Sequence, residues 1–208
     1  MTIYESAKLE FRRKVFVLAG AKIHVSDQAS GQQVGFVKMK AFKLKEDIRL
    51  FSDESKTQEL LTIKARQIFD FGATYDVTDP QSGTKMFSLR RKGLRSTFVR
   101  DKWLILDPQD NEYGYYEEAG TLALIRRYTG WIPLVGGLVE FVFFFLTIDY
   151  ELYVTTSGQP QLAATMTRRK NPFVIKYETD AGAGETNVDN RIIVAATTML
   201  SIIEVSKN

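Results

Sequence analysis

The chain contains no cysteine and only one histidine among its 208 residues. Without cysteine the protein has no disulfides, no thiolate nucleophile, no zinc finger and no iron–sulfur cluster. A single imidazole, that of His24, cannot form a multi-histidine metal site, and the chain lacks the G-x-S-x-G motif of a serine hydrolase. From these absences we expect a protein that is not an enzyme and that holds neither a metal nor a cofactor.

Neither the charge nor the aromatic residues mark the chain as a nucleic-acid-binding protein. Lys and Arg number 28 against 25 Asp and Glu, so the net charge is only +3, which is too small to indicate nucleic acid by itself. Tyr113, Tyr115 and Tyr116 lie among glutamates, whereas an aromatic platform for bases has basic neighbours. With 44% hydrophobic and 25% charged residues, the composition is that of one globular domain.

No segment has the pattern of a secretory signal or a convincing membrane span. The apolar run after residue 14 is short and lacks a suitable cleavage site. Residues 131–148 are apolar but contain Pro133 and Glu140. Residues 192–203 are uncharged, but as a helix they cover only about 18 Å of a bilayer core of roughly 30 Å. We therefore expect a cytoplasmic protein, which can still associate peripherally with a membrane.

Similar segments recur along the chain. Four of them are spaced by 26, 26 and 28 residues, and each ends in an aspartate: Asp27, Asp53, Asp79 and Asp107. A cluster of turn-forming residues and a second extended run follow each aspartate, which is the pattern of a β-hairpin. A fifth copy has Thr156 in place of the aspartate. We expect an antiparallel meander of about ten strands or more, and so many twisted strands usually close or fold over.

The alternation of side chains within these runs is that of strands with one buried face. Two residues before each aspartate the side chain is apolar, and we expect it to point inward: Val25, Phe51, Val77 and Ile105. On three return strands we expect the eighth and tenth residues after the aspartate to point inward too: Gly35, Val37, Leu61, Ile63, Phe87 and Leu89.

Basic residues occupy the outward positions at the end of the return strands. Six of them stand 11 and 13 residues after an aspartate, and two more follow the fourth turn. We name these eight residues the predicted collar: Lys38, Lys40, Lys64, Arg66, Arg90, Lys92, Arg126 and Arg127. If the return strands end at one rim, the collar can contact phosphate groups. Alternatively, outward strand positions need only be polar, and lysines protect strand edges.

Residues 188–205 are apolar on nearly every side. A helix with this pattern must be buried on nearly every side. Its length would be roughly 27 Å, which matches the length of about 26 Å expected for an eight-residue strand. The helix can therefore lie inside a barrel formed by the hairpins. The alternative is a terminal membrane anchor, for which the segment is short.

The hairpins and the closing helix resemble the tubby C-terminal superfamily, and most of all its LURP-one-related and phospholipid scramblase branch. Residues 69–118 and 189–200 carry the resemblance. It implies a mainly β fold, a closed antiparallel barrel of about twelve strands around the last helix, and a non-enzymatic role. Relatives bind phosphoinositides or are linked to calcium-dependent lipid scrambling. The chain lacks the scramblases' cysteine-rich segment and an EF-hand-like loop before the helix, so we do not expect calcium-driven scrambling.

Residues 130–146 form an apolar insertion after the fourth hairpin. One interpretation is an apolar plug that dips into a bilayer or contacts a partner through Trp131, Ile132, Leu134 and Val135. The other is a core strand with a packed turn, or a homodimer surface, because short apolar runs do not reveal their period.

These patterns support two hypotheses about function. The first is a binding module that contacts phospholipid headgroups or an anionic membrane surface through the predicted collar. The second is a soluble protein-interaction or scaffolding barrel that self-associates through residues 130–146. The turn aspartates do not indicate calcium, because each turn supplies only one or two carboxylates and calcium takes six to eight oxygen ligands. We expect these aspartates to stabilise the turns by bonding to their own backbone.

Overall fold

The computed structural model of the protein describes most of the chain and leaves several connections out. The described residues are 2–14, 21–39, 48–66, 73–92, 102–119, 148–156, 158–170, 173–184, 186 and 188–203. In chain order the elements are β1 (Lys8–Lys14), β2 (Ala21–Asp27), β3 (Gln33–Met39), β4 (Ile48–Phe51), β5 (Glu59–Ala65), β6 (Thr74–Thr78), β7 (Lys85–Arg91), β8 (Lys102–Leu106), β9 (Glu112–Glu118), β10 (Ile148–Thr156), β11 (Gln159–Lys170), β12 (Val174–Asp180) and α3 (Asn190–Ile203).

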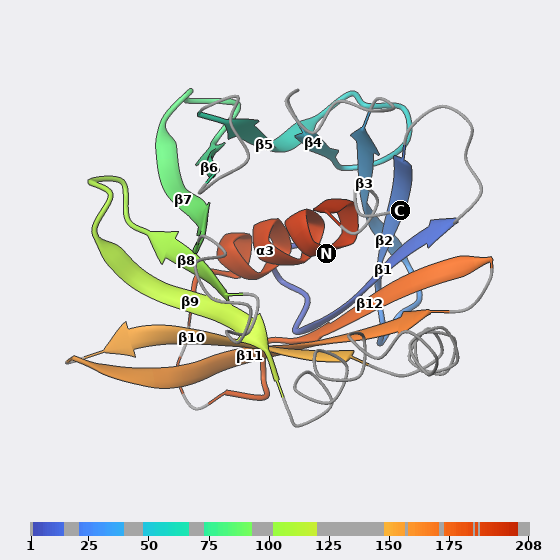
Figure 1. The fold of residues 1–208 in the computed structure, drawn as a ribbon. Helices are drawn as coiled ribbons and strands as arrows, with labels where there is room; N and C mark the ends of the chain where they lie inside the picture. The colour runs from blue at the N-terminus through green and yellow to red at the C-terminus, as the bar shows by residue number, and fades with distance from the viewer. Residues whose placement is uncertain are drawn as a thin grey trace, which may run out of the picture.

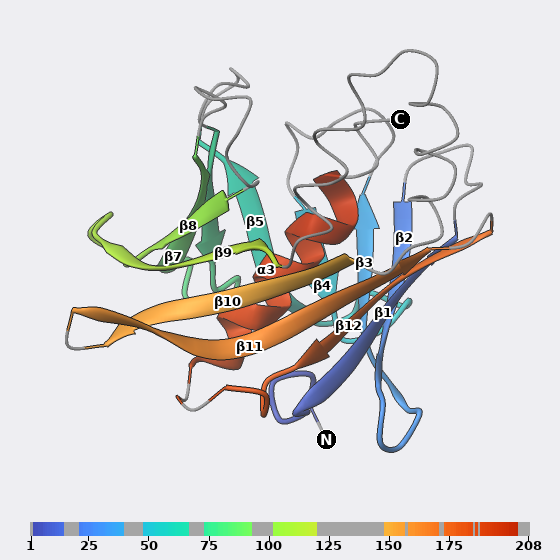
Figure 2. The ribbon, with the colours of Figure 1, turned by 60° about the horizontal axis from the view of Figure 1, so that its bottom comes forward.

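The strands form one closed antiparallel barrel (Figures 1 and 2). Each strand pairs with its neighbours in the chain, and β1 closes the barrel by pairing with β12, from Lys8 opposite Asp180 to Lys14 opposite Val174. Closure leaves no long sheet edge open to another chain. The fold class predicted from the hairpin pattern is confirmed.

All five predicted hairpins form: β2–β3, β4–β5, β6–β7, β8–β9 and β10–β11. Each turn contains one described residue with a positive φ angle: Gly31, Lys56, Gly83, Asp110 and Gly158. Three of these are glycines, the residue that adopts this conformation most readily. The two exceptions, Lys56 and Asp110, place charged side chains at hairpin turns.

The second hairpin does not follow the predicted alignment. Its closing backbone hydrogen bond runs from Ser52 N to Gln58 O (3.0 Å), whereas in the first hairpin the corresponding bond runs from Asp27 N to Gln32 O (2.9 Å). Ser52 therefore occupies the position of the aspartate in the other repeats, and Asp53 lies inside a turn that is one residue longer. As a consequence Leu50, which is 1% exposed, is the inward residue, and the prediction for Phe51 is wrong.

The other predicted inward positions are buried. Val25, Val77 and Ile105 are fully buried on the outgoing strands. The return strands bury all six of the predicted residues, which are Gly35, Val37, Leu61, Ile63, Phe87 and Leu89. Hairpin alternation thus predicted which face of these strands forms the core.

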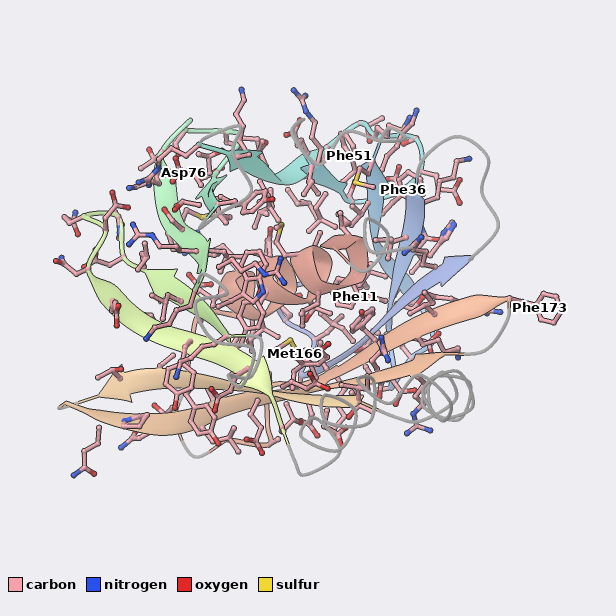
Figure 3. The ribbon with its side chains drawn as sticks, in the orientation of Figure 1. Phe11, Phe36, Phe51, Asp76, Met166 and Phe173 are labelled. Atoms are coloured by element: carbon pink, nitrogen blue, oxygen red, sulfur yellow. The ribbon has the colours of Figure 1, made fainter. Side chains whose placement is uncertain are left out.

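Helix α3 lies inside the barrel (Figure 1). Val194, Ala195 and Ala196 are completely buried, and Phe11 and Met166 lie beside the helix (Figure 3). Two of its buried hydroxyl groups bond to the helix backbone: Thr197 Oγ1 donates to Ile193 O at 2.8 Å and Ser201 Oγ donates to Thr198 O at 2.7 Å. The buried Thr198 Oγ1 has no hydrogen-bond partner among the described residues. Because α3 lies inside the barrel, the alternative of a terminal membrane anchor is wrong. Over the described residues, no helix combines the length and the apolar character that crossing a bilayer requires.

The barrel wall closes over the carboxyl end of α3. Arg13 Nη1 donates to Ser201 O at 3.3 Å, and Tyr177 Oη donates to Leu200 O at 3.2 Å. These two strand residues satisfy carbonyl groups that the end of a helix leaves without intrahelical partners. The helix therefore has a fixed position along the barrel axis.

Candidate anion-binding surface

The described part of the predicted collar points outward, as expected. Lys38, Lys64, Arg66 and Lys92 are exposed and Arg90 is half-buried. Lys40, Arg126 and Arg127 lie outside the described residues. So do residues 130–146 with Trp131, Ile132, Leu134 and Val135, and the interpretations of that insertion stay predictions.

Carboxylates neutralise Arg66, the collar residue that follows β5. The Arg66 guanidinium forms ion pairs with Asp76 (Nη2–Oδ1, 2.5 Å) and with Asp110 (Nη2–Oδ1, 2.9 Å). Lys85 Nζ lies 3.0 Å from the same Asp110 oxygen. Lys64 is the Cα partner of Asp76 on the neighbouring strand. This side of the barrel, around the Asp76 label in Figure 3, is a network of mixed charge.

The pKa values of this network follow its geometry. Side-chain hydrogen bonds from Arg66 and then Lys85 hold the pKa of Asp110 well below its usual range. Partial burial raises the pKa of Asp76, but hydrogen bonds from Arg66 and Ser88 outweigh burial and leave the pKa lowered. The hydrogen bonds to both carboxylates raise the pKa of Arg66. These groups stay charged at neutral pH and pair with one another, so their positive charge is largely balanced and does not favour an external anion.

The collar residue on β3 has a different environment. Lys38 is the Cα partner of Lys22 on β2 and of Arg49 on β4, and all three side chains are exposed. Directly opposed residues on adjacent strands have Cβ atoms about 4.5–5.5 Å apart. Three basic side chains therefore stand in one row across three strands.

A fourth cation, Lys56, reaches this row from the β4–β5 turn. The interaction of the two amines, through a side-chain hydrogen bond and then charge repulsion, lowers the pKa of Lys38. Among the described residues, no ion pair with a carboxylate involves Lys22, Lys38 or Lys56. Positive charge is thus concentrated in this row.

A second row of outward residues extends the positive surface toward β11. Arg12 on β1 is exposed and is the Cα partner of His24 on β2 and of Lys176 on β12. Lys176 is in turn the Cα partner of Arg169 on β11. We define the basic face by its exposed members on β1 to β4 and the β4–β5 turn: Arg12, Lys22, Lys38, Arg49 and Lys56.

Carboxylates around the basic face pair with residues at its margins. Glu59 contacts Arg49 at 3.2 Å, and Glu54 lies 3.3 Å from the His24 imidazole. Further out, Glu10 pairs with Lys176 at 2.8 Å and Glu178 with Arg169 at 3.2 Å. Among the described residues, the other four members of the basic face form no ion pair with a carboxylate: Arg12, Lys22, Lys38 and Lys56.

Packing of the β4–β5 turn against the sheet positions Lys56. Phe36 occupies an outward position on β3 and yet is only 1% exposed. The ring of its cross-strand partner His24 contacts it edge-on at 5.3 Å between centroids, and the contact of His24 Nδ1 with Glu54 Oε1 at 3.3 Å links the turn to β2. Phe36 and Phe51 lie together on this side of the barrel (Figure 3). The longer turn that displaced the predicted alignment therefore carries Lys56 over β3.

A family model described as LURP-one-related matches residues 33–127. The match covers 95 of the 208 residues and identifies these residues as LURP-one-related. That family belongs to the tubby-like superfamily, and the resemblance seen in the sequence is confirmed. No curated protein and no solved structure matches the chain.

The matched stretch of the LURP-one-related domain contains only part of the basic face. Lys38, Arg49 and Lys56 fall within residues 33–127, whereas Arg12 and Lys22 precede it. The sequence pattern predicted only Lys38 among these residues, because the collar was defined from basic residues on the return strands alone. The same alternation on the outgoing strands places Lys22 one residue before the buried Ile23 and Arg49 one residue before the buried Leu50, and this signal could have identified both residues.

The turn aspartates bond to their own turns, as expected. Asp27 Oδ1 accepts hydrogen bonds from Ser30 N and Oγ at 2.7 Å each, and these bonds lower its pKa. Asp107 Oδ1 accepts from Gln109 N and Asn111 N at 2.9 Å each. The described residues contain no group of three or more histidine or acidic side chains arranged to hold a metal ion.

Proposed function

We propose that this LURP-one-related domain is a non-enzymatic binding module that contacts phospholipid headgroups at an anionic membrane surface through the basic face. The predicted collar is thereby replaced by a different set of residues, of which only Lys38 is common to both. The proposal rests on one observation: four exposed cations lie on neighbouring strands and the β4–β5 turn, and none of them forms an ion pair with a described carboxylate.

The shape of the basic face supports contact with an extended surface. Its members lie on the outer side of four adjacent strands rather than in the barrel interior, which α3 and the core side chains fill. Each Lys or Arg near an anionic lipid surface contributes about 1 kcal/mol. Several such cations together give reversible attachment that weakens as salt screens the charges.

Sedimentation with vesicles tests this function. Wild-type protein should pellet with phosphatidylserine-containing vesicles, remain in solution with pure phosphatidylcholine, and be released by salt. The double variant Lys22→Gln/Lys38→Gln should bind the anionic vesicles roughly ten- to thirtyfold more weakly, since two cations are lost.

A matched control distinguishes the basic face from the predicted collar. Lys64→Gln/Lys92→Gln removes the same number of charges from β5 and from the residue that follows β7, on the side of the barrel that carries Asp76 and Asp110. This variant should bind as the wild type does. Equal losses of vesicle affinity in the two variants would contradict the assignment to the basic face. If the wild-type protein binds anionic and neutral vesicles equally, the proposed function itself is wrong.

A further inference from the structure

Phe173 is the most exposed large hydrophobic side chain among the described residues. It is 70% exposed, and only one other large hydrophobic residue described, Tyr113 at 37%, is more than one third exposed. Figure 3 shows the Phe173 ring projecting away from the barrel, just before β12. An aromatic ring in water gives up the favourable free energy of burial.

The position of Phe173 links it to the basic face. Lys176, three residues further along β12, is the Cα partner of both Arg169 on β11 and Arg12 on β1. In the closed sheet β12 lies next to β1, the strand of Arg12, and two strand spacings of about 4.8 Å from β2, the strand of Lys22. The exposed ring and the basic face can therefore contact the same surface at once.

We propose that Phe173 is an apolar anchor that enters the interfacial layer of an anionic bilayer while the basic face contacts the headgroups. This inference rests on the proposed function and specifies that its ligand is a lipid surface. Cations beside an exposed aromatic ring suit such a surface, because headgroup phosphates attract the cations and the layer beneath them accepts the ring. A soluble phosphate compound would use the cations and leave the ring in water.

Tyr113 provides a matched control within the same chain. It begins β9 beside the β8–β9 turn, which is at the opposite end of the barrel from the end of β11 and the start of β12. Its sequence neighbours include Glu112 and Glu117. A protein docked through the basic face keeps this residue away from the bilayer.

The absence of cysteine allows a probe at a single chosen position. Phe173→Cys and Tyr113→Cys are each labelled with a polarity-sensitive nitrobenzoxadiazole dye and mixed with the vesicles of the sedimentation assay. With anionic vesicles the dye at position 173 should shift its emission to the blue, brighten, and be quenched by lipids that carry a quencher near the headgroups. The dye at position 113 should change little.

Unlabelled variants measure the contribution of the ring to binding. Phe173→Ala should weaken binding to anionic vesicles by about tenfold, as expected for partial burial of one phenyl ring, and Tyr113→Ala should not. Circular dichroism and thermal unfolding establish that both variants are folded. Both positions lie outside the hydrophobic core.

The results separate the two proposals. If the protein sediments with anionic vesicles but the dye at position 173 does not respond and Phe173→Ala binds normally, the anchor is wrong and the proposed function stands. Equal responses at positions 173 and 113 would also overturn the anchor. If the wild type does not bind vesicles, both proposals fail, and binding to another protein would then become the explanation for the exposed ring.

Discussion

Asp110, in the turn between β8 and β9, accepts two hydrogen bonds from the guanidinium of Arg66, which follows β5. The distances are 3.0 Å from Nη1 to Oδ2 and 2.9 Å from Nη2 to Oδ1. The pair joins residues 44 positions apart in the chain and draws the β8–β9 turn over the outer side of β6 and β7. A planar bidentate contact of this kind is geometrically specific, so the outer surface of the barrel has a defined electrostatic structure on this side.

This pair predicts a pH-dependent contribution to stability. Because the pKa of Asp110 is lowered in the folded state, its stabilising effect is fully present above the unfolded-state value of about 3.9 and is lost as the pH falls through the folded-state value. Asp110→Asn should have a lower urea midpoint than the wild type at pH 7, and the difference should shrink toward pH 2. A difference that stays constant with pH would contradict the assigned charge interaction.

The backbone conformation and the position of Lys56 lead us to expect that this residue lowers the stability of the fold and strengthens binding to anionic vesicles. Its φ angle of 59° favours glycine, and its amine lowers the pKa of Lys38. Lys56→Gly should relieve the unfavourable backbone conformation, raise or preserve the urea midpoint, and yet weaken binding to anionic vesicles several-fold.

The corresponding change in the β8–β9 turn is the control for Lys56→Gly. Asp110 has a similar φ angle of 68°, but Asp110→Gly also removes the contacts with Arg66 and Lys85 and should lower the urea midpoint. If both glycine variants lose stability alike, the interpretation of Lys56 as a residue retained for binding is wrong.

The sequence predicted the hairpins and the buried helix because both depend on local patterns. Alternation identified Val25 and Leu61 as core residues, and an apolar helix had no other place to be buried. The prediction for Phe51 is wrong because aspartate does not mark a fixed position of the turn: Ser52 occupies that position in the second hairpin, and the turn is one residue longer. Turn length depends on backbone conformations that aspartate alone does not specify.

The candidate site was harder to predict than the fold. Lys38 and Arg66 both belong to the predicted collar, one on β3 and the other just after β5, and their partners from other parts of the chain distinguish them. Asp110 neutralises Arg66 from a turn 44 residues away, while Lys56 adds a second positive charge beside Lys38. These relationships depend on how the turns fold back over the barrel, which a repeat pattern does not contain.

Gly114 should be essential for the pairing of β9 with β10. A Cβ at this position would lie 2.3 Å from Tyr153 O and 3.0 Å from Val154 Cα, both backbone atoms. Backbone cannot rotate away as a side chain can, so Gly114→Ala should cost about 3 kcal/mol of unfolding free energy in urea titrations.

Gly35 is the matched control for Gly114. Its added Cβ would approach Ile3 Cδ1 at 2.9 Å, the far end of a flexible side chain. Gly35→Ala should therefore cost only about 1 kcal/mol, near the lower limit for overpacking. A larger loss at Gly35 than at Gly114 would show that the tight approach of β9 to β10 is not as the structure has it.

Burial of α3 predicts a large difference between two positions on the same helix. Met199 is completely buried inside the barrel, and Met199→Ala leaves a cavity that should cost about 2–5 kcal/mol of unfolding free energy. Arg191 lies at the first turn and pairs with Asp189, with both side chains more than 40% exposed (42% and 41%), so Arg191→Ala should change stability by less than about 1 kcal/mol. Urea unfolding measures both, and the near-ultraviolet circular dichroism of Met199→Ala should also reveal looser packing of the surrounding aromatic rings. Similar small effects at the two positions would mean that the helix is not enclosed, and the barrel would then need another core.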